Sequence, residues 1–168
     1  MQVQSPANGD CFFHALHTAL NASGLRSKSP RWLRLNLLSH KALQVFQEKN
    51  SLSFDELLYF VLLDCSDSER SFIQLKQNPK GIRALSHALC AYNRNTPYVW
   101  ASGAIIAAVI SQLNTNKISV RIVNSRQLHS CKNDIEDRLR QNANSESITI
   151  FLCYSGSHYE ALIVDDLQ

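Results

Sequence analysis

The sequence predicts an α+β fold in which helices pack around a small, mostly antiparallel sheet. Apolar residues recur with a helical period from Cys11 to about Leu113, whereas three short segments after that point have strand patterns, either alternation or an enrichment in β-branched and aromatic residues. Helical segments followed by strands are typical of this class. The 168 residues contain no linker rich in Gly, Ser or Pro, so we expect a single domain over residues 1–168.

The helices are predicted from apolar periodicity and from their start signals. Pro30 is in a favourable position to open a helix. Ser53, followed by Glu56, forms a capping-box pattern. The expected helices are one from Cys11 that ends near 21–24, then 30–46, 53–63, one or two between 66 and 95 with a break near 78–81, and 102–113.

The strands are predicted from alternation and from β-branched or aromatic residues. They cover 117–124, 147–154 and 158–165. The short "SGS" before His158 predicts a hairpin between the last two strands.

Composition excludes several classes of protein. The net charge of +3 comes from scattered residues and does not indicate nucleic-acid binding. No stretch is long and apolar enough for a membrane span, and the N-terminal residues do not resemble a signal peptide. Five cysteines at irregular spacings favour reduced thiols in a cytosol-like compartment.

The segment "NGDCFFHAL" places Cys11 on the first turn of an apolar helix. A helix start favours the thiolate, which is the nucleophilic form of cysteine. Gly9 suits a tight turn with positive φ, which would let the amides of Asp10 and Cys11 hold an oxyanion. The negative charge of Asp10 beside the thiol raises its pKa, so an imidazolium partner is needed.

The candidate base is His158, at the start of the last expected strand. Glu160 is two residues on, and strand alternation places both side chains on one face. A carboxylate beside an imidazole fixes its tautomer and stabilises the cation. The remaining histidines are His14, His17, His40, His87 and His129, and their contexts favour polar helix or loop positions.

Other interpretations of these residues remain open. Cys11 is also consistent with a buried structural cysteine, and with His14 and His17 it could form a metal site. A papain-like acyl transfer or peptidoglycan amide cleavage would use the same Cys–His chemistry.

Three segments in order resemble the ovarian-tumour (OTU) family of cysteine proteases. "NGDCFFHAL" is similar to that family's cysteine motif, "YVWASGAIIAAVISQLNTNKISVRIV" to its helix–strand block, and "HYEAL" to its histidine motif. The chain departs from the family pattern at Asn8, at His14, at Ala101 after Trp100, and at Glu160, where Asp or Asn is usual. These departures point to a divergent member, such as a viral or bacterial effector acting in a host cytosol.

The resemblance implies a papain-like fold and a deubiquitinase that cleaves after the C-terminal glycine of ubiquitin. It assigns the nucleophile to Cys11, the base to His158 and the orienting acid to Glu160. The oxyanion turn is Asn8, Gly9 and Asp10.

The resemblance also bears on partners and substrate contacts. The expected partner is ubiquitin or polyubiquitin, bound by a monomer that needs no cofactor or metal, with the helical segment 53–95 as the recognition region. The substrate tail is expected to pass Trp100 and the loop 154–157, with Tyr159 as a further contact; Trp100 is equally consistent with core packing. A catalytically weak or inactive ubiquitin-binding module is the alternative.

Overall fold

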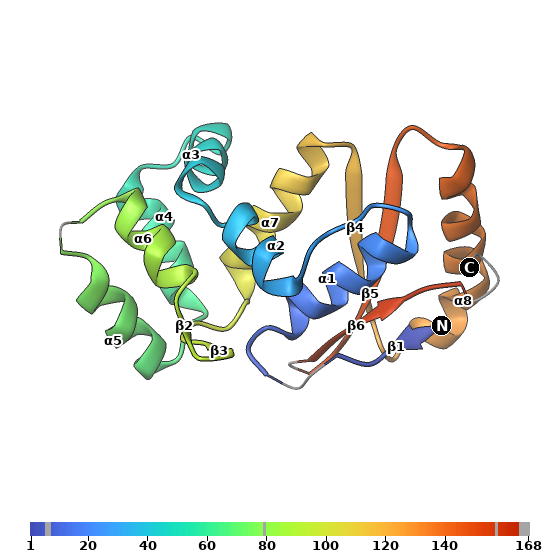
Figure 1. The fold of residues 1–168 in the computed structure, drawn as a ribbon, viewed down its shortest axis with the longest axis horizontal. Helices are drawn as coiled ribbons and strands as arrows, with labels where there is room; N and C mark the ends of the chain where they lie inside the picture. Colours follow the sequence, from blue (N-terminus) through green and yellow to red (C-terminus); the bar gives the residue numbers. More distant parts are fainter. Residues whose placement is uncertain (6–7, 79, 157, 165–168) are drawn as a thin grey trace. The chain divides into compact units, whose positions relative to one another are not determined.

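The computed structural model describes residues 1–5, 8–78, 80–156 and 158–164, and its chain divides into two compact units. Unit 1 comprises residues 1–7, 11–33 and 113–168; unit 2 comprises residues 8–10 and 34–112. Two of the boundaries fall inside helices α2 (Pro30–Leu37) and α7 (Gly103–Thr115), and the other two flank residues 8–10. Figure 1 labels the elements along the chain.

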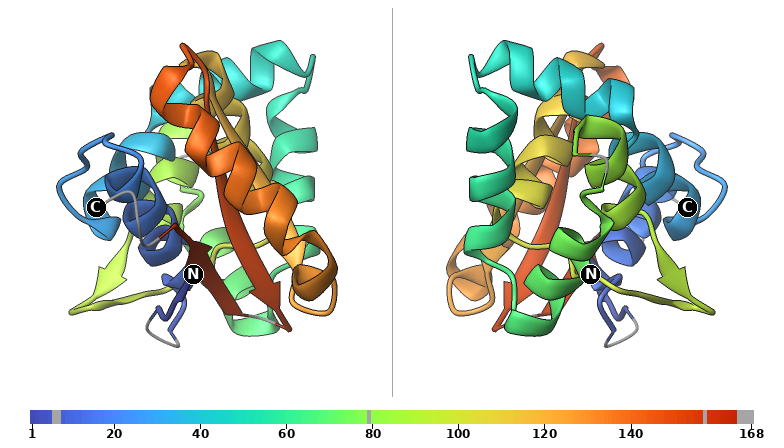
Figure 2. Two further views of the ribbon diagram at one scale, coloured as in Figure 1. Left: turned by 90° about the vertical axis from the view of Figure 1, so that its right-hand side faces the viewer. Right: turned by 90° about the vertical axis from the view of Figure 1, so that its left-hand side faces the viewer.

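Unit 1 is built on a four-stranded sheet in the order β1-β6-β5-β4. Its elements are β1 (Gln2–Val3), α1 (Cys11–Ala22), β4 (Ile118–Asn124), α8 (Leu128–Gln141), the 3-10 turn η1 (Asn142–Asn144), β5 (Ile148–Ser155) and β6 (His158–Leu162). α1 packs against β6 and β5, and α8 packs against β5. Figure 2 (left) shows α1 and α8 on opposite faces of the sheet.

The α+β class is confirmed, but the sheet is mixed rather than mostly antiparallel. β5 pairs antiparallel with β6, and β6 with β1, whereas β4 and β5 are parallel. Parallel neighbours need a crossover of a dozen residues or more. α8 supplies that crossover, and its polar sequence concealed it: its buried apolar residues are Ile135 and Leu139.

Unit 2 is mainly helical. It holds α3 (His40–Lys49), α4 (Phe54–Leu63), α5 (Asp67–Lys76), α6 (Ile82–Leu89) and the small hairpin β2 (Tyr92–Asn93) with β3 (Thr96–Pro97). The expected capping box is present, with Ser53 and Glu56 bonded to each other's backbone N–H groups. The expected break near 78–81 is also confirmed, because α5 ends at Lys76 and α6 begins at Ile82.

The single helix expected over 30–46 is wrong. The chain forms α2 and α3 instead, and the Ser39 side chain accepts a hydrogen bond from the Ala42 backbone N–H at the start of α3. Serine caps a new helix well because its hydroxyl satisfies an otherwise unpaired amide. The periodic apolar pattern continued across this break and did not reveal it.

Among the described helices, none combines the length and the apolar character needed to cross a lipid bilayer.

Candidate active site

Cys11 is the first residue of α1, as the sequence predicted. The helix forms because its apolar residues fall on one side and are buried: Phe12, Phe13, Ala15, Leu16, Ala19 and Leu20. Cys11 itself is 5 % exposed. The thiol therefore lies at the end of the helix that favours a negative charge, with little access to solvent.

His158 and Glu160 form a pair on β6. The distance from His158 Nε2 to Glu160 Oε1 is 3.4 Å, and the two side chains are 27 % and 16 % exposed. This is an ion-pair distance, longer than a charge-assisted hydrogen bond. A protonated His158 would be stabilised by the carboxylate, as the orienting role requires.

An aromatic contact joins the N-terminal end of α1 to the start of β6. The rings of Phe12 and Tyr159 meet edge-on with centroids 5.3 Å apart, and Tyr159 also contacts Tyr154. Burial raises the pKa of Tyr159 to about 12, with smaller contributions from Tyr154 and Cys11. Phe12 follows Cys11 in the chain and Tyr159 follows His158, so this contact packs the two candidate segments against each other.

The two faces of β6 carry different parts of the candidate site. Because successive side chains alternate, Tyr159 lies on the face that α1 covers, and His158 with Glu160 on the other. Glu160 pairs in register with Cys153, and Leu162 on the same face belongs to the core beneath α8. Cys11 must therefore approach His158 around the edge of β6 rather than through the sheet.

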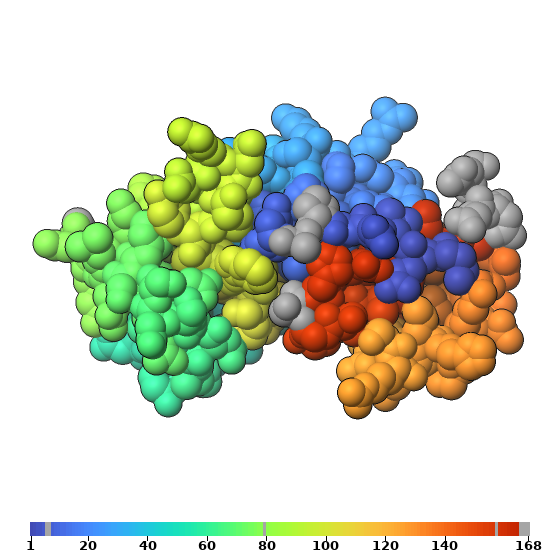
Figure 3. Space-filling view, turned by 90° about the horizontal axis from the view of Figure 1, so that it is seen from below, coloured from blue at the N-terminus to red at the C-terminus, as the bar shows by residue number. Residues whose placement is uncertain are grey.

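Among the described strands, none pairs with that edge of β6 at His158. β1 pairs with β6 only at Ala161 and Leu162, at the far end of the strand. In Figure 3 the red surface of β5 and β6 lies beside the blue surface of the N-terminal segment. The approach of Cys11 to His158 along this edge stays a prediction. Ser157, in the loop expected beside the substrate tail, lies outside the described residues.

The turn before Cys11, Asn8–Asp10, belongs to unit 2 and is held by the side chain of Asn8. Asn8 Oδ1 accepts a hydrogen bond from the Asp10 backbone N–H at 2.9 Å. One of the two amides expected to bind an oxyanion is therefore already engaged. Asn8, which replaces the family's usual Asp, acts here through an amide oxygen and needs no charge.

Glycine is required at position 9 because there is no room for a side chain. The expectation of a positive φ at Gly9 is wrong. The described glycines with positive φ are Gly24, Gly81, Gly103 and Gly156. A Cβ on Gly9 would lie 2.5 Å from Cδ1 of Trp100, closer than real side chains pack. Ala101 N also donates to Gly9 O at 3.4 Å. Trp100 thus packs on the turn while remaining 44 % exposed.

Replacing Gly9 by alanine is expected to lower the free energy of unfolding by about 1–3 kcal/mol, because the new methyl group overlaps the indole ring. Urea unfolding measures this loss. In a Trp100→Ala background the same change should cost at least about 1 kcal/mol less. Gly24→Ala is the control, because nothing lies within 4 Å of its Cβ position and its cost should not depend on Trp100. Equal costs in both backgrounds would contradict the contact.

Sequence reasoning missed two residues that hold Asp10. Asp10 is 3 % exposed, and its Oδ1 lies 2.8 Å from Nη1 of Arg34, which has no exposed surface. The Tyr92 hydroxyl donates to the other carboxylate oxygen, Oδ2. The charge of Asp10 is therefore balanced within unit 2. One sequence signal could have indicated a buried ion pair: Arg34 is a charged residue between apolar neighbours on an amphipathic helix.

Most of the other cysteines are poorly suited to attack. All five thiols are free. Burial raises the pKa of Cys65 to about 11 and raises that of Cys90. Burial and the nearby Glu160 carboxylate raise the pKa of Cys153. These three thiols stay protonated at neutral pH, and a thiol is a much weaker nucleophile than a thiolate.

The proposed metal ligands are not grouped as a site. Within the described ranges no three His, Cys, Asp or Glu side chains are arranged to hold a metal ion. His17 Nδ1 lies 2.6 Å from Ser27 Oγ, and its Nε2 lies 3.2 Å from Asn21 Nδ2. The Nδ1 contact ties the loop after α1 to the helix, whereas the Nε2 contact lies within α1 itself.

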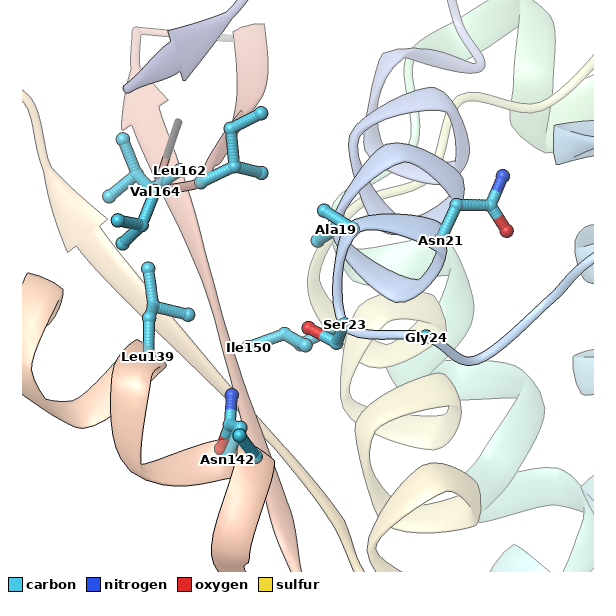
Figure 4. Close-up of a pocket in the computed structure, with 12 residues that line it drawn as sticks. Ala19, Asn21, Ser23, Gly24, Leu139, Asn142, Ile150, Leu162 and Val164 are labelled. Atoms are coloured by element: carbon cyan, nitrogen blue, oxygen red, sulfur yellow. The ribbon is translucent and has the colours of Figure 1, made fainter. Parts of the chain in front are cut away.

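A cavity of about 400 Å³ in unit 1 lies at the opposite end of α1 from Cys11 (Figure 4). Residues that line it include Ala19, Asn21, Leu139, Asn142, Ile150 and Leu162. α1 has 12 residues, so its two ends are ~18 Å apart. None of the predicted site residues lines this cavity, and it is separate from the candidate active site.

No protein-family model, no curated protein and no solved structure matches this chain.

Proposed function

We propose that the chain is an OTU-like cysteine protease that hydrolyses the bond after the C-terminal glycine of ubiquitin. The observation that carries the proposal is the His158–Glu160 pair on β6, the strand against which the Cys11 end of α1 packs through Phe12 and Tyr159. The order of the three sequence motifs supports the same assignment. The mixed sheet with α1 on one face is compatible with a papain-like fold.

The proposed reaction begins with transfer of the Cys11 proton to His158, which leaves a thiolate and an imidazolium. The thiolate attacks the glycine carbonyl, and the tetrahedral intermediate collapses to a thioester as the imidazolium gives its proton to the leaving amine. Water then attacks the thioester while neutral His158 accepts its proton, and the Cys11 thiol leaves. Glu160 stabilises the imidazolium at each stage.

The oxyanion is proposed to bind the backbone amides of Asp10 and Cys11. The hydrogen bond from Asp10 N to Asn8 Oδ1 must open before the first of these can serve. Each oxyanion donor contributes about 3 kcal/mol to transition-state stabilisation. Rotation of the Asn8 side chain away from this amide, with the backbone of the turn unchanged, is therefore a step that substrate binding has to drive.

Ubiquitin recognition is proposed to use the exposed side chains of the helical segment 53–95, which leaves buried residues such as Ser86 outside the interface. The segment exposes several large apolar side chains, namely Tyr59, Phe60, Leu63 and Leu75, which are 62 %, 43 %, 48 % and 77 % exposed. Apolar surface of this kind is typical of the core of a protein interface. Trp100, also exposed, is the proposed contact for the glycine tail.

The alternative is a ubiquitin-binding module without turnover. Two observations favour it: Cys11 is almost fully buried, and the Asp10 amide is already bonded. Action in a reducing, cytosol-like compartment fits both functions, since all five cysteines are free. An effector released into a host cytosol would meet that condition.

A ubiquitin carrying a C-terminal electrophile is expected to form one covalent adduct with the protein, seen as a mass increase of one ubiquitin. Cys11→Ala should abolish the adduct, because only the thiolate attacks. Cys131→Ala is the matched control, because Cys131 is a free and partly exposed thiol on α8. Binding of ubiquitin by wild type and Cys11→Ala alike, with no adduct in either, would establish the binding module instead.

A further inference from the structure

The turn Asn8–Asp10 is clamped from several sides by residues of unit 2. The Asp10 carboxylate binds Arg34 through Oδ1 and Tyr92 through Oδ2. Gly9 is packed by Trp100, and the Gly9 carbonyl accepts a hydrogen bond from Ala101 N.

Arg34 is the centre of this clamp. Its Nε donates to Leu89 O at 2.8 Å, its Nη1 to Asp10 Oδ1 at 2.8 Å, and its Nη2 to Val99 O. One guanidinium therefore ties the turn to the end of α6 and to the segment before Trp100. Its planar fork presents donors in fixed directions, which lysine cannot reproduce. The Tyr92 ring also lies 5.9 Å from Arg34 Cζ.

A buried charge pair is a costly way to hold a turn. Removing two ions from water has a large desolvation penalty, and an apolar replacement is often equally stable. The pair is better explained by specificity of position, because the directional bonds to Asp10 allow its backbone few alternatives. The next residue along the chain is Cys11, so holding the Asp10 backbone also restricts the peptide from which α1 starts.

We propose that Arg34 and Tyr92 are positioning residues that hold the turn Asn8–Asp10, and with it the backbone at Cys11, in the arrangement needed for attack. The inference rests on the proposed function for its catalytic meaning. Neither residue touches the substrate; both act through Asp10. A displacement of about 1 Å at a reacting group can reduce the rate a hundredfold, so a clamp of this kind has a measurable effect.

Tyr92→Phe tests the proposal with the smallest change, because it removes a single hydroxyl donor from Asp10. Turnover of a ubiquitin C-terminal fluorogenic amide should show kcat reduced about tenfold with KM within about twofold of wild type. Alkylation of the buried Cys11 by iodoacetamide should become faster, because Cys11 follows Asp10 directly and a loosened turn lets the first turn of α1 fray. Asp10→Asn is the second variant and should move both measurements in the same directions.

Ser86→Ala is the matched control. The Ser86 hydroxyl donates to Leu38 O at 2.7 Å, is buried in the same unit, and has no bond to the turn. It should lose comparable stability and retain wild-type kcat and alkylation rate. Unchanged kcat and alkylation in both Tyr92→Phe and Asp10→Asn, or equal changes in Ser86→Ala, would overturn the clamp. A wild type without any turnover would refute the proposed function, and Cys11 alkylation alone would then decide the clamp.

Discussion

Replacing His158 by glutamine is expected to slow hydrolysis of a ubiquitin C-terminal amide by about 10²–10⁴-fold, the usual contribution of a general acid and base. Glutamine keeps much of the size of histidine but cannot carry a proton between Cys11 and the leaving amine. The partly exposed side chain contributes little to the core, so the variant should unfold at nearly the wild-type urea concentration. The measurement is kcat/KM with stability recorded in parallel.

His129→Gln is the control for this variant. His129 is exposed on α8, in the same unit, and its replacement should change kcat/KM less than twofold. Glu160→Gln should fall between the two, because it removes the negative charge 3.4 Å from the imidazole and retains its shape. If His158→Gln and His129→Gln have the same activity, His158 is not the base and the triad proposal fails.

The elements that could be predicted from the sequence are those marked by residues within the element itself. Ser53 and Glu56 predict a helix because a capping box involves only residues at the start of that helix. The strand β5 is predicted by its β-branched residues. The break at Ser39 was missed because the apolar period runs across it, although the Ser39 cap is itself a local signal. The helix α8 was missed because most of its residues are polar. The long connection 125–147 did hold a usable signal, since only a crossover of that length permits parallel pairing of β4 and β5.

The candidate site divides in the same way. Strand alternation correctly placed His158 and Glu160 together, because a spacing of two residues fixes the face of a strand. The reason for Gly9 was wrong, because its constraint comes from Trp100, far along the sequence, rather than from its own backbone. Arg34 and Tyr92 could not be connected to Asp10 for the same reason: their partners are distant in sequence and meet only after folding.

Arg34→Met is expected to have the largest effect on stability, lowering the free energy of unfolding by about 3–5 kcal/mol. Methionine fills much of the volume but leaves Asp10 as a buried charge without its cation. The hydrogen bond from the Tyr92 hydroxyl to Asp10 remains. The carbonyls of Leu89 and Val99 also lose their donor. Domains of ordinary stability have a free energy of unfolding of about 5–15 kcal/mol, so this loss is visible in a urea titration followed by circular dichroism.

The origin of that loss can be separated by a second substitution. Asp10→Asn in the Arg34→Met background removes the uncompensated charge and should restore at least about 1 kcal/mol, whereas the orphaned carbonyls prevent full recovery. Arg83→Met, an exposed position on α6, should change stability by less than about 0.5 kcal/mol. A cost for Arg34→Met no greater than for Arg83→Met would mean that the buried pair does not hold the turn. A large cost unaffected by Asp10→Asn would place the stabilisation in the carbonyl contacts rather than in the charge pair.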